Sequence, residues 1–264
     1  MRVARIVGRS LLSAAFVIAI ILGLWVAGLK LFDVPVFVGK GPAEVWEYLF
    51  DLPASGENRS ELLVQLRQTL LDAGVGFVAG MIAAVVVASG IVLSKGVEAA
   101  VMPMAMVLRS VPLVALAPII ALIFGNGYGV VAAMSGIVVL FPALVNIVFG
   151  LRSVSPQMSD LVHVYGGNGW VALRKIAFPS ALPALFASIR ISVPGAITGA
   201  LLAESLSTGK GIGNAVVIAS AGSANSEVWA LVVVVTLVSV VLYLAAQLVE
   251  SLVLARFGRE AGRA

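Results

Sequence analysis

The sequence predicts an all-α integral membrane protein with about six transmembrane helices, organised as a single transmembrane domain over residues 1–264. Hydrophobic residues make up 61% of the chain and charged residues only 11%, whereas an ordinary soluble domain carries about a quarter charged residues. The mean hydropathy is +1.10, and long uncharged runs recur along the whole length. Because a helix satisfies its own backbone hydrogen bonds in lipid, each of these runs predicts a membrane-crossing helix.

Six segments have the length that a span needs, which is about 20 residues for about 30 Å of hydrocarbon. The first follows Arg2, Arg5 and Arg9 in the manner of a signal peptide. Its apolar run is too long for one and lacks a small-residue cleavage pattern, so we expect it to be retained. The third and fifth segments contain prolines, which kink helices. The six segments are 11–29, 73–94, 99–124, 130–150, 181–202 and 228–249.

The distribution of lysine and arginine predicts the orientation, since these residues are retained on the cytoplasmic side. With the N-terminus inside, the outer segments hold Lys30, Lys40, Arg59, Arg67 and Lys210. The cytoplasmic segments hold twice as many, so both termini are predicted to be cytoplasmic. These residues also account for the net charge of +4 without a nucleic-acid partner. The cytoplasmic set is Arg2, Arg5, Arg9, Lys95, Arg152, Arg174, Lys175, Arg256, Arg259 and Arg263.

The composition excludes several kinds of chemistry. Cysteine is absent, so there can be no disulfide, thiolate metal site or cysteine nucleophile. The single histidine, His163, cannot build a multi-histidine zinc site or a haem site with two histidine ligands. No cluster of nucleophile, base or metal ligands is recognisable. We therefore predict no catalytic residue, no metal ligand and no enzyme activity.

Two features outside the spans predict local structure. Residues 39–42 form a turn, and residues 43–52 have the pattern of a short amphipathic surface helix. Gly76 and Gly80 lie four residues apart on the second span. Small residues at this spacing let a neighbouring helix approach closely in lipid, so we expect a helix contact there.

The most informative segment is the polar stretch 152–183, which is predicted to face the cytoplasm between the fourth and fifth spans. It has the pattern of two short helices, and such a loop can either dock a soluble partner or be an ordinary interfacial loop. Pro156 would begin the first helix, which would run to residue 165. The predicted boundary residues are Ser155 and Asn168 as N-caps, Gly166 and Gly167 ending the first helix, Pro179 ending the second, and Ser180 capping the fifth span.

This loop resembles the EAA loop of bacterial ABC-importer permeases, whose pattern is Glu-Ala-Ala, three residues, Gly, nine residues and Ile-x-Leu-Pro. Asp160 stands at the acidic position, Gly166 at the glycine, and Ile176 and Pro179 at the closing positions. The spacing matches throughout. The departures are Leu161 and Val162 in place of the two alanines and Phe178 in place of leucine. The resemblance implies an ATPase-coupling site formed by Asp160, His163, Gly166, Ile176 and Pro179.

The resemblance covers about residues 34–257, and these segments are similar to the nitrate/sulfonate/taurine branch of the family. It implies a bacterial plasma (inner) membrane protein that pairs with a second permease copy as a homodimer. It also implies two cytoplasmic ATPase subunits that bind ATP–Mg, an external solute-binding protein, and a small organic or inorganic anion as the solute. This chain would bind no cofactor itself. The segments that carry the resemblance outside the loop are 34–46, 108–112, 150–154, 178–183 and 203–204.

No nucleotide-binding motif appears in the chain. Residues 209–213 read Gly-Lys-Gly-Ile-Gly, but a P-loop needs serine or threonine directly after its lysine. We interpret this segment as a turn on the outer side. ATP would therefore be hydrolysed by a separate chain.

Polar residues inside the spans are candidates for the translocation pathway. Arg109 and Glu204 interrupt apolar segments, and a charge near the bilayer centre costs about 2.5–3.5 kcal/mol on insertion scales. Arg109 with Ser110 could line the pathway and attract an anion, or Arg109 could pair with Glu204 to hold the helices together. Asn146 and Thr198 are further candidates, although single polar residues are as often hydrogen-bond partners between helices.

A transporter or channel that acts without an ATPase is the competing hypothesis. A transporter driven by an ion gradient needs coupling carboxylates buried in several spans, and Glu204 alone fits that requirement. Six spans without a clear inverted repeat also argue against it.

Overall fold

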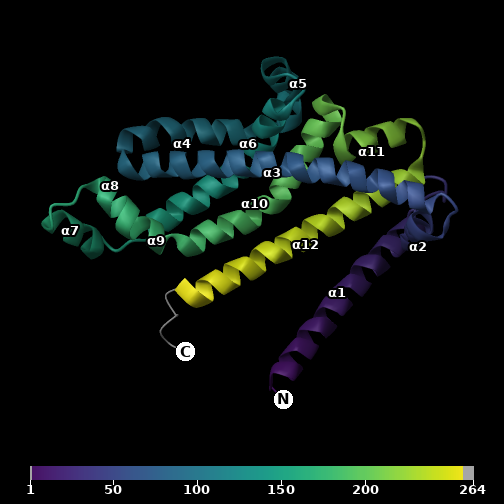
Figure 1. Cartoon of the computed structure of the whole chain (residues 1–264), viewed down its shortest axis with the longest axis horizontal. Coiled ribbons are helices and arrows are strands. Elements are labelled where there is room, and N and C mark those ends of the chain that lie inside the picture. The colour runs from purple at the N-terminus through teal and green to yellow at the C-terminus, as the bar shows by residue number, and fades with distance from the viewer. Residues whose placement is uncertain (1, 258–264) are drawn as a thin grey trace.

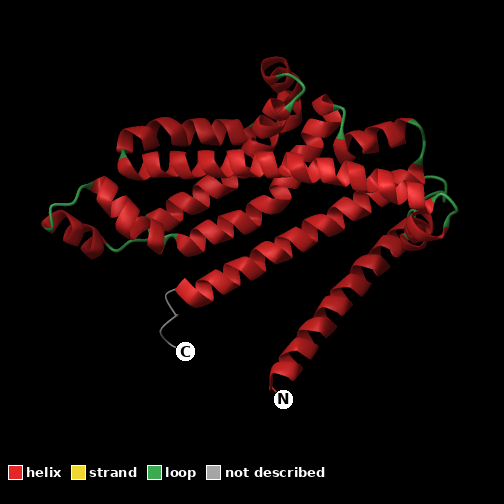
Figure 2. Cartoon of the chain, viewed as in Figure 1, coloured by secondary structure: helices red, strands yellow, loops and turns green. Residues whose placement is uncertain are grey.

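The computed structural model describes the backbone of residues 2–257 and, from residue 16 to residue 256, the side chains of all but residues 109, 156, 159 and 163. This part of the chain consists of helices and the loops that join them, and holds no strand (Figure 2). The α-helices are α1 (Arg2–Leu31), α2 (Pro42–Trp46), α3 (Ser55–Leu93), α4 (Lys95–Ser110), α5 (Leu113–Phe124), α6 (Tyr128–Leu151), α7 (Pro156–Val164), α8 (Gly169–Ala172), α9 (Phe178–Ser180), α10 (Leu182–Ala203), α11 (Gly211–Ala221) and α12 (Asn225–Phe257). Three π-helical segments extend them: η1 (Glu47–Asp51), η2 (Leu173–Ala177) and η3 (Glu204–Thr208).

Four of these helices are long and apolar enough to cross a membrane by themselves: α3, α6, α10 with η3, and α12. The pair α4 and α5 makes a fifth candidate if it is counted as one broken span. Within the described residues, the apolar part of α1, Phe16–Leu31, is shorter. The chain is therefore a multi-pass, all-α membrane protein, as the sequence predicts.

The third predicted span, 99–124, is not one continuous helix. Helices α4 and α5 meet at an angle of 109°. The break lies at Val111 and Pro112, whose backbones are extended, with ψ of 126° and 120°. A proline disfavours the helical conformation of the residue before it, which explains the break at this place.

The core of the bundle is the contact of α6 with α3 on one side and α10 on the other (Figure 1). The three helices meet at Ser135, which is fully buried and whose Oγ donates to the carbonyl of Ala196 at 2.9 Å. A Cβ on Gly76 would overlap the Ser135 side chain, and a Cβ on Gly199 would overlap the Ser135 backbone. A Cβ on Gly80 would lie 2.5 Å from the Gly136 carbonyl oxygen. The predicted close helix contact at Gly76 and Gly80 is confirmed.

We expect Gly76→Ala to lower the melting temperature of the detergent-solubilised protein. Forcing an extra methyl group into a close-packed contact costs about 1–3 kcal/mol, and Ser135 is hydrogen-bonded in place. Gly74→Ala on the same helix is the matched control, because no atom lies within 4 Å of its added Cβ. Equal melting temperatures for the two variants would contradict the contact.

Helix α1 is joined to the bundle at the end opposite its N-terminus. Trp25 stacks on Trp229 of α12 with 5.5 Å between ring centroids, and the Trp229 indole donates to the Val38 carbonyl at 2.9 Å. From this region α1 and α12 diverge, so the first residues of α1 and the last of α12 lie at the same side of the molecule (Figure 1). The predicted surface helix 43–52 is present as α2 and η1.

Candidate functional site

The predicted loop 152–183 projects beyond one end of the bundle, with α7 at its tip (Figure 1). Helix α7 begins at Pro156, as predicted, and ends at Val164. Gly166 follows with φ of +77°, in the left-handed region that favours glycine. The Asn168 side chain accepts a hydrogen bond from the Val171 amide at 3.0 Å and caps α8. The predicted roles of Gly166 and Asn168 in the backbone are confirmed.

Two other boundary predictions in this loop are wrong. Pro179 does not end the second helix, because α8 continues through η2 into α9, where Pro179 occupies the first turn. The helical run ends one residue after it, at Ser180. Ser180 does not cap the fifth span. Ala181 stands at that position without a side-chain hydrogen bond, and its amide donates to the Ala177 carbonyl at 2.8 Å.

The loop has a buried base and an exposed tip. Leu173 and Ala177 in η2 are buried, at 2% and 6% exposure, and belong to a core cluster that includes residues of α3 and α6. On α7, by contrast, Leu161 is 51% exposed and Val164 is 82% exposed. Tyr165, directly after the helix, is 83% exposed. The tip therefore carries apolar side chains that nothing in the described chain covers.

The structure places the five sequence-predicted coupling residues along this loop. Asp160 and Gly166 are exposed at the tip, Pro179 is exposed at the base, and Ile176 is half-buried. The side chain of His163 lies outside the described residues. The predicted coupling residues therefore extend from the exposed tip of the loop to its packed base.

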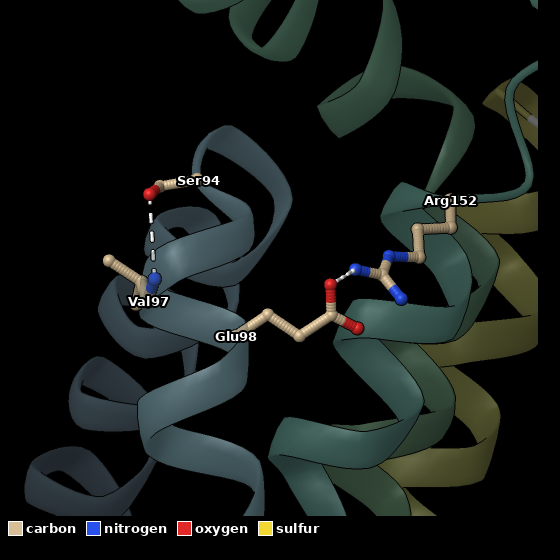
Figure 3. A network of polar contacts seen from close by, with 4 residues as sticks. All are labelled: Ser94, Val97, Glu98 and Arg152. Atoms are coloured by element: carbon tan, nitrogen blue, oxygen red, sulfur yellow. Dashed lines mark hydrogen bonds and ion pairs between the residues drawn. The ribbon is translucent and has the colours of Figure 1, made fainter.

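An ion pair connects the beginning of the loop to α4 (Figure 3). The Arg152 guanidinium lies 2.7 Å from the Glu98 carboxylate. This hydrogen bond raises the pKa of Arg152 and lowers the pKa of Glu98, so the pair stays ionised. Ser94 caps α4 by accepting from the Val97 amide at 3.4 Å. Solvent screens an exposed ion pair strongly, so this contact fixes relative position more than it adds stability.

The structure does not bring the predicted pathway residues together through hydrogen bonds. The Ser110 hydroxyl donates to the Val107 carbonyl and that of Thr198 to the Pro194 carbonyl, both within their own helices. Asn146 is half-buried. The Arg109 side chain, and with it the predicted contact between Arg109 and Glu204, lies outside the described residues. Among the described members of the set, Glu204 alone is fully buried.

Glu204 belongs to a polar cluster that receives the N-terminus of α11. Its Oε2 accepts from the Thr69 hydroxyl at 2.9 Å and from the Gly213 amide at 2.8 Å. Thr69 Oγ1 accepts from the Ile212 amide at 2.8 Å, and Gln65 Oε1 accepts from the Gly211 amide at 2.9 Å. Three of the four amides that a helix leaves unpaired at its start are thus bound by side chains of α3 and η3.

Two glycines make this approach possible. Gly211 has φ of +82°, and a Cβ there would overlap the Glu204 carboxyl group. A Cβ on Gly213 would overlap the Leu201 carbonyl and lie 2.8 Å from the Cβ of Glu204. The interpretation of 209–213 as an outer turn is therefore wrong for its second half, because α11 begins at Gly211.

Asp72 completes the cluster. It is 2% exposed, and its Oδ1 accepts from the Gln68 amide at 3.0 Å. Its carboxyl group also interacts electrostatically with that of Glu204. Sequence reasoning missed Gln65, Thr69 and Asp72 because it began the second span at residue 73. The sequence feature that could have located this cluster is Glu204 followed closely by Gly211 and Gly213.

Comparison with known proteins identifies the family. Residues 76–259 match the family described as binding-protein-dependent transport system inner membrane component. The riboflavin transport system permease protein of Chloroflexus aurantiacus is 28% identical over 88% of this chain and 85% of that protein. A permease of Bacillus subtilis named for aliphatic sulfonates transport is 26% identical over 83% of this chain and 78% of that protein.

A solved structure has the same fold. The crystal structure of a bacterial ABC transporter involved in the import of the acidic polysaccharide alginate matches with a TM-score of 0.57 at 16% sequence identity. The match covers 95% of this chain and 99% of that one. The family match over most of the chain and the permease relatives show that the protein belongs to the binding-protein-dependent transport system inner membrane components and is an ABC transporter permease subunit.

Proposed function

We propose that this chain forms the translocation pathway of an ATP-driven importer and receives the movement of a cytoplasmic ATPase through the loop 152–183. The observation that carries the proposal is the contrast between the two parts of that loop. Its tip exposes Leu161, Val164 and Tyr165, and its base is packed into the core through Leu173 and Ala177. A partner that binds the tip would move α3 and α6 with it, because the base contacts both helices.

The other parts of the proposed transporter are separate chains. ATP–Mg would bind to the ATPase chains and not to this one. A second copy of the permease would form the other wall of the pathway, and an external solute-binding protein would deliver the solute. The loop then faces the cytoplasm, as do both termini, and the membrane is the bacterial inner membrane. Alternating access would result from movement of the two permeases relative to each other as the ATPases close.

For the solute we propose a small organic or inorganic anion, such as a sulfonate, taurine or nitrate. The relative named for aliphatic sulfonates transport supports this class. The relative named for riboflavin transport supports a neutral ring compound as the second candidate. To distinguish the two classes, compounds of each class are added as competitors and uptake is measured in cells that express the whole transporter.

The test of the proposed function is co-purification. Tagged wild-type chain is extracted in mild detergent from its native host, the eluate is assayed for ATP hydrolysis, and the complex is placed in liposomes for uptake measurements. We expect an ATPase subunit in the eluate and uptake that requires ATP. Purification of the chain alone, with uptake that proceeds without ATP, would overturn the proposal in favour of a transporter that needs no ATPase.

A further inference from the structure

Two buried carboxyl groups, 132 positions apart in the sequence, lie where η3 packs on α3: Glu204 accepts from Thr69, which is one helical turn before Asp72. Asp72 is 2% exposed and Glu204 is 1% exposed. Each has one oxygen bound by protein donors: Asp72 Oδ1 by Gln68, and Glu204 Oε2 by Thr69 and Gly213. The other oxygens, Asp72 Oδ2 and Glu204 Oε1, have no donor among the described residues.

The two carboxyl groups are nevertheless close enough to interact electrostatically. An ionised carboxylate can only accept, so a hydrogen bond between two carboxyl groups requires a proton on one of them. Two like charges in contact and away from water also disfavour full ionisation of both. One bound proton removes both difficulties, because an O–H on one group donates to the free oxygen of the other.

The surrounding basic side chains do not neutralise the two carboxylates in place of that proton. Lys210, directly before α11, is the one basic side chain that acts on Asp72 among the described residues. The neighbouring helices α5, α6 and α11 contain no charged residue at all. Helix α10 contributes Arg190, which is paired instead with Glu250 of α12 at 3.3 Å.

A metal ion fits the site poorly. Hard cations take six or more oxygen ligands, or keep several waters, and no group of three or more metal-binding side chains exists in the described part of the chain. The N-terminus of α11 directs its amides at the same cluster, and the positive end of a helix dipole disfavours a cation. Gly211 also lies against the Glu204 carboxyl group, where even a Cβ would overlap it.

We propose that Asp72 and Glu204 bind one proton between them, and that this proton holds the N-terminal end of α11 against α3. In the protonated state the pair carries a single negative charge, which the α11 amides stabilise through Glu204. On deprotonation the proton passes to solvent, the pair carries two negative charges, and its two free oxygens face each other. The contact between α3 and α11 then weakens.

The test compares wild type with Asp72→Asn over a range from mildly acidic to mildly alkaline pH. The asparagine amide places an N–H where the proton lies and keeps an acceptor for Gln68, so the variant pair carries at most one negative charge. We expect the melting temperature of wild type to fall as the pH rises and that of the variant to stay constant over the same range. Other acids such as Glu61 and Glu227 are unchanged in the variant, so their titration cancels in the comparison.

A cross-linking experiment measures the movement itself. The chain has no cysteine, so Leu62→Cys in α3 and Ala215→Cys in α11 can be introduced without background; the two residues line one cavity. We expect the yield of a short cross-link to fall with rising pH in the wild-type background and to stay constant with Asp72→Asn. Glu204→Gln, which also supplies an amide N–H, should give the same constant yield and serves if the asparagine variant does not fold.

Infrared difference spectroscopy on the wild type needs no variant. A pH jump should remove the carbonyl band of a buried protonated carboxyl group. A wild type without this band, or a pH dependence that persists in both amide variants, would overturn the proposal. So would loss of the pH dependence in Arg109→Gln, because it would show that the sequence-predicted arginine partner carries the effect. Each of these measurements is independent of the transported solute and of the ATPase.

Discussion

Replacing Gly166 by valine is expected to lower ATP-driven uptake about tenfold while the permease remains folded. Gly166 adopts φ of +77° between α7 and α8. The left-handed conformation costs an L-residue roughly 1–2 kcal/mol, and a β-branched residue is among the least suited to it. About 1.4 kcal/mol corresponds to a tenfold change in an equilibrium. The fraction of molecules with α7 in its native orientation should fall accordingly.

The measurement is uptake in liposomes together with the amount of ATPase that co-purifies with the tagged chain. Gly169→Ala is the matched control, because Gly169 is the first residue of α8 and its added Cβ would meet only Leu93 Cδ2, at an ordinary 3.6 Å. We expect the control to retain both the ATPase and uptake. Normal uptake by the Gly166 variant would show that the orientation of α7 does not matter for coupling.

The base of the loop suggests how a force on α7 would reach the bundle. Leu173 and Ala177 belong to the same core cluster as Ala88 and Ile91 near the end of α3. Arg152, at the beginning of the loop, is paired with Glu98 of α4. A displacement of the loop would therefore act on α3 and α4 together. Because close-packed contacts have few stable arrangements, small shifts at such a base tend to move whole helices.

Local patterns in the sequence predicted the local features of the fold. The apolar runs located the membrane helices, and Asn168 and Gly166 located the turn between α7 and α8. Each of these signals depends on a few neighbouring residues and on hydrogen bonds within one turn. The spacing of Gly76 and Gly80 predicted a close helix contact, but not that Ser135 would be the residue in contact.

The polar cluster at α11 could not be predicted in the same way. The hydrogen bond from Thr69 to Glu204 joins residues 135 positions apart, and no local pattern specifies such a pairing. The first half of α3 is also polar enough to look like a segment outside the membrane, which led the sequence analysis to begin the span at residue 73. Asp72 was therefore not recognised as a buried carboxyl group. Helix α11 is short and begins with glycines, so it resembled a turn.

Glu204→Ala is expected to give the largest loss of stability of any single substitution considered, at least about 2 kcal/mol. The substitution leaves the Gly213 amide without its acceptor at 2.8 Å. It also removes the 2.9 Å acceptor of the Thr69 hydroxyl, which keeps only its longer bond to the Gln65 carbonyl at 3.2 Å. A buried donor without a partner costs about 1–3 kcal/mol. It also removes the negative charge that the N-terminus of α11 stabilises, which contributes up to about 2 kcal/mol in partly buried geometries.

The melting temperature in detergent measures this loss, and Ser207→Ala is the matched control in the same π-helical segment. The Ser207 hydroxyl is buried and has no hydrogen-bond partner among the described residues, so its removal leaves no donor or acceptor unpaired and should change little. Glu204→Gln should fall between the two, because its amide oxygen can still accept from Gly213. If Glu204→Ala melted at the temperature of Ser207→Ala, the attachment of α11 would have to depend on its apolar contacts, such as buried Ile212 and Ala219, and not on the three side chains that bind its first amides.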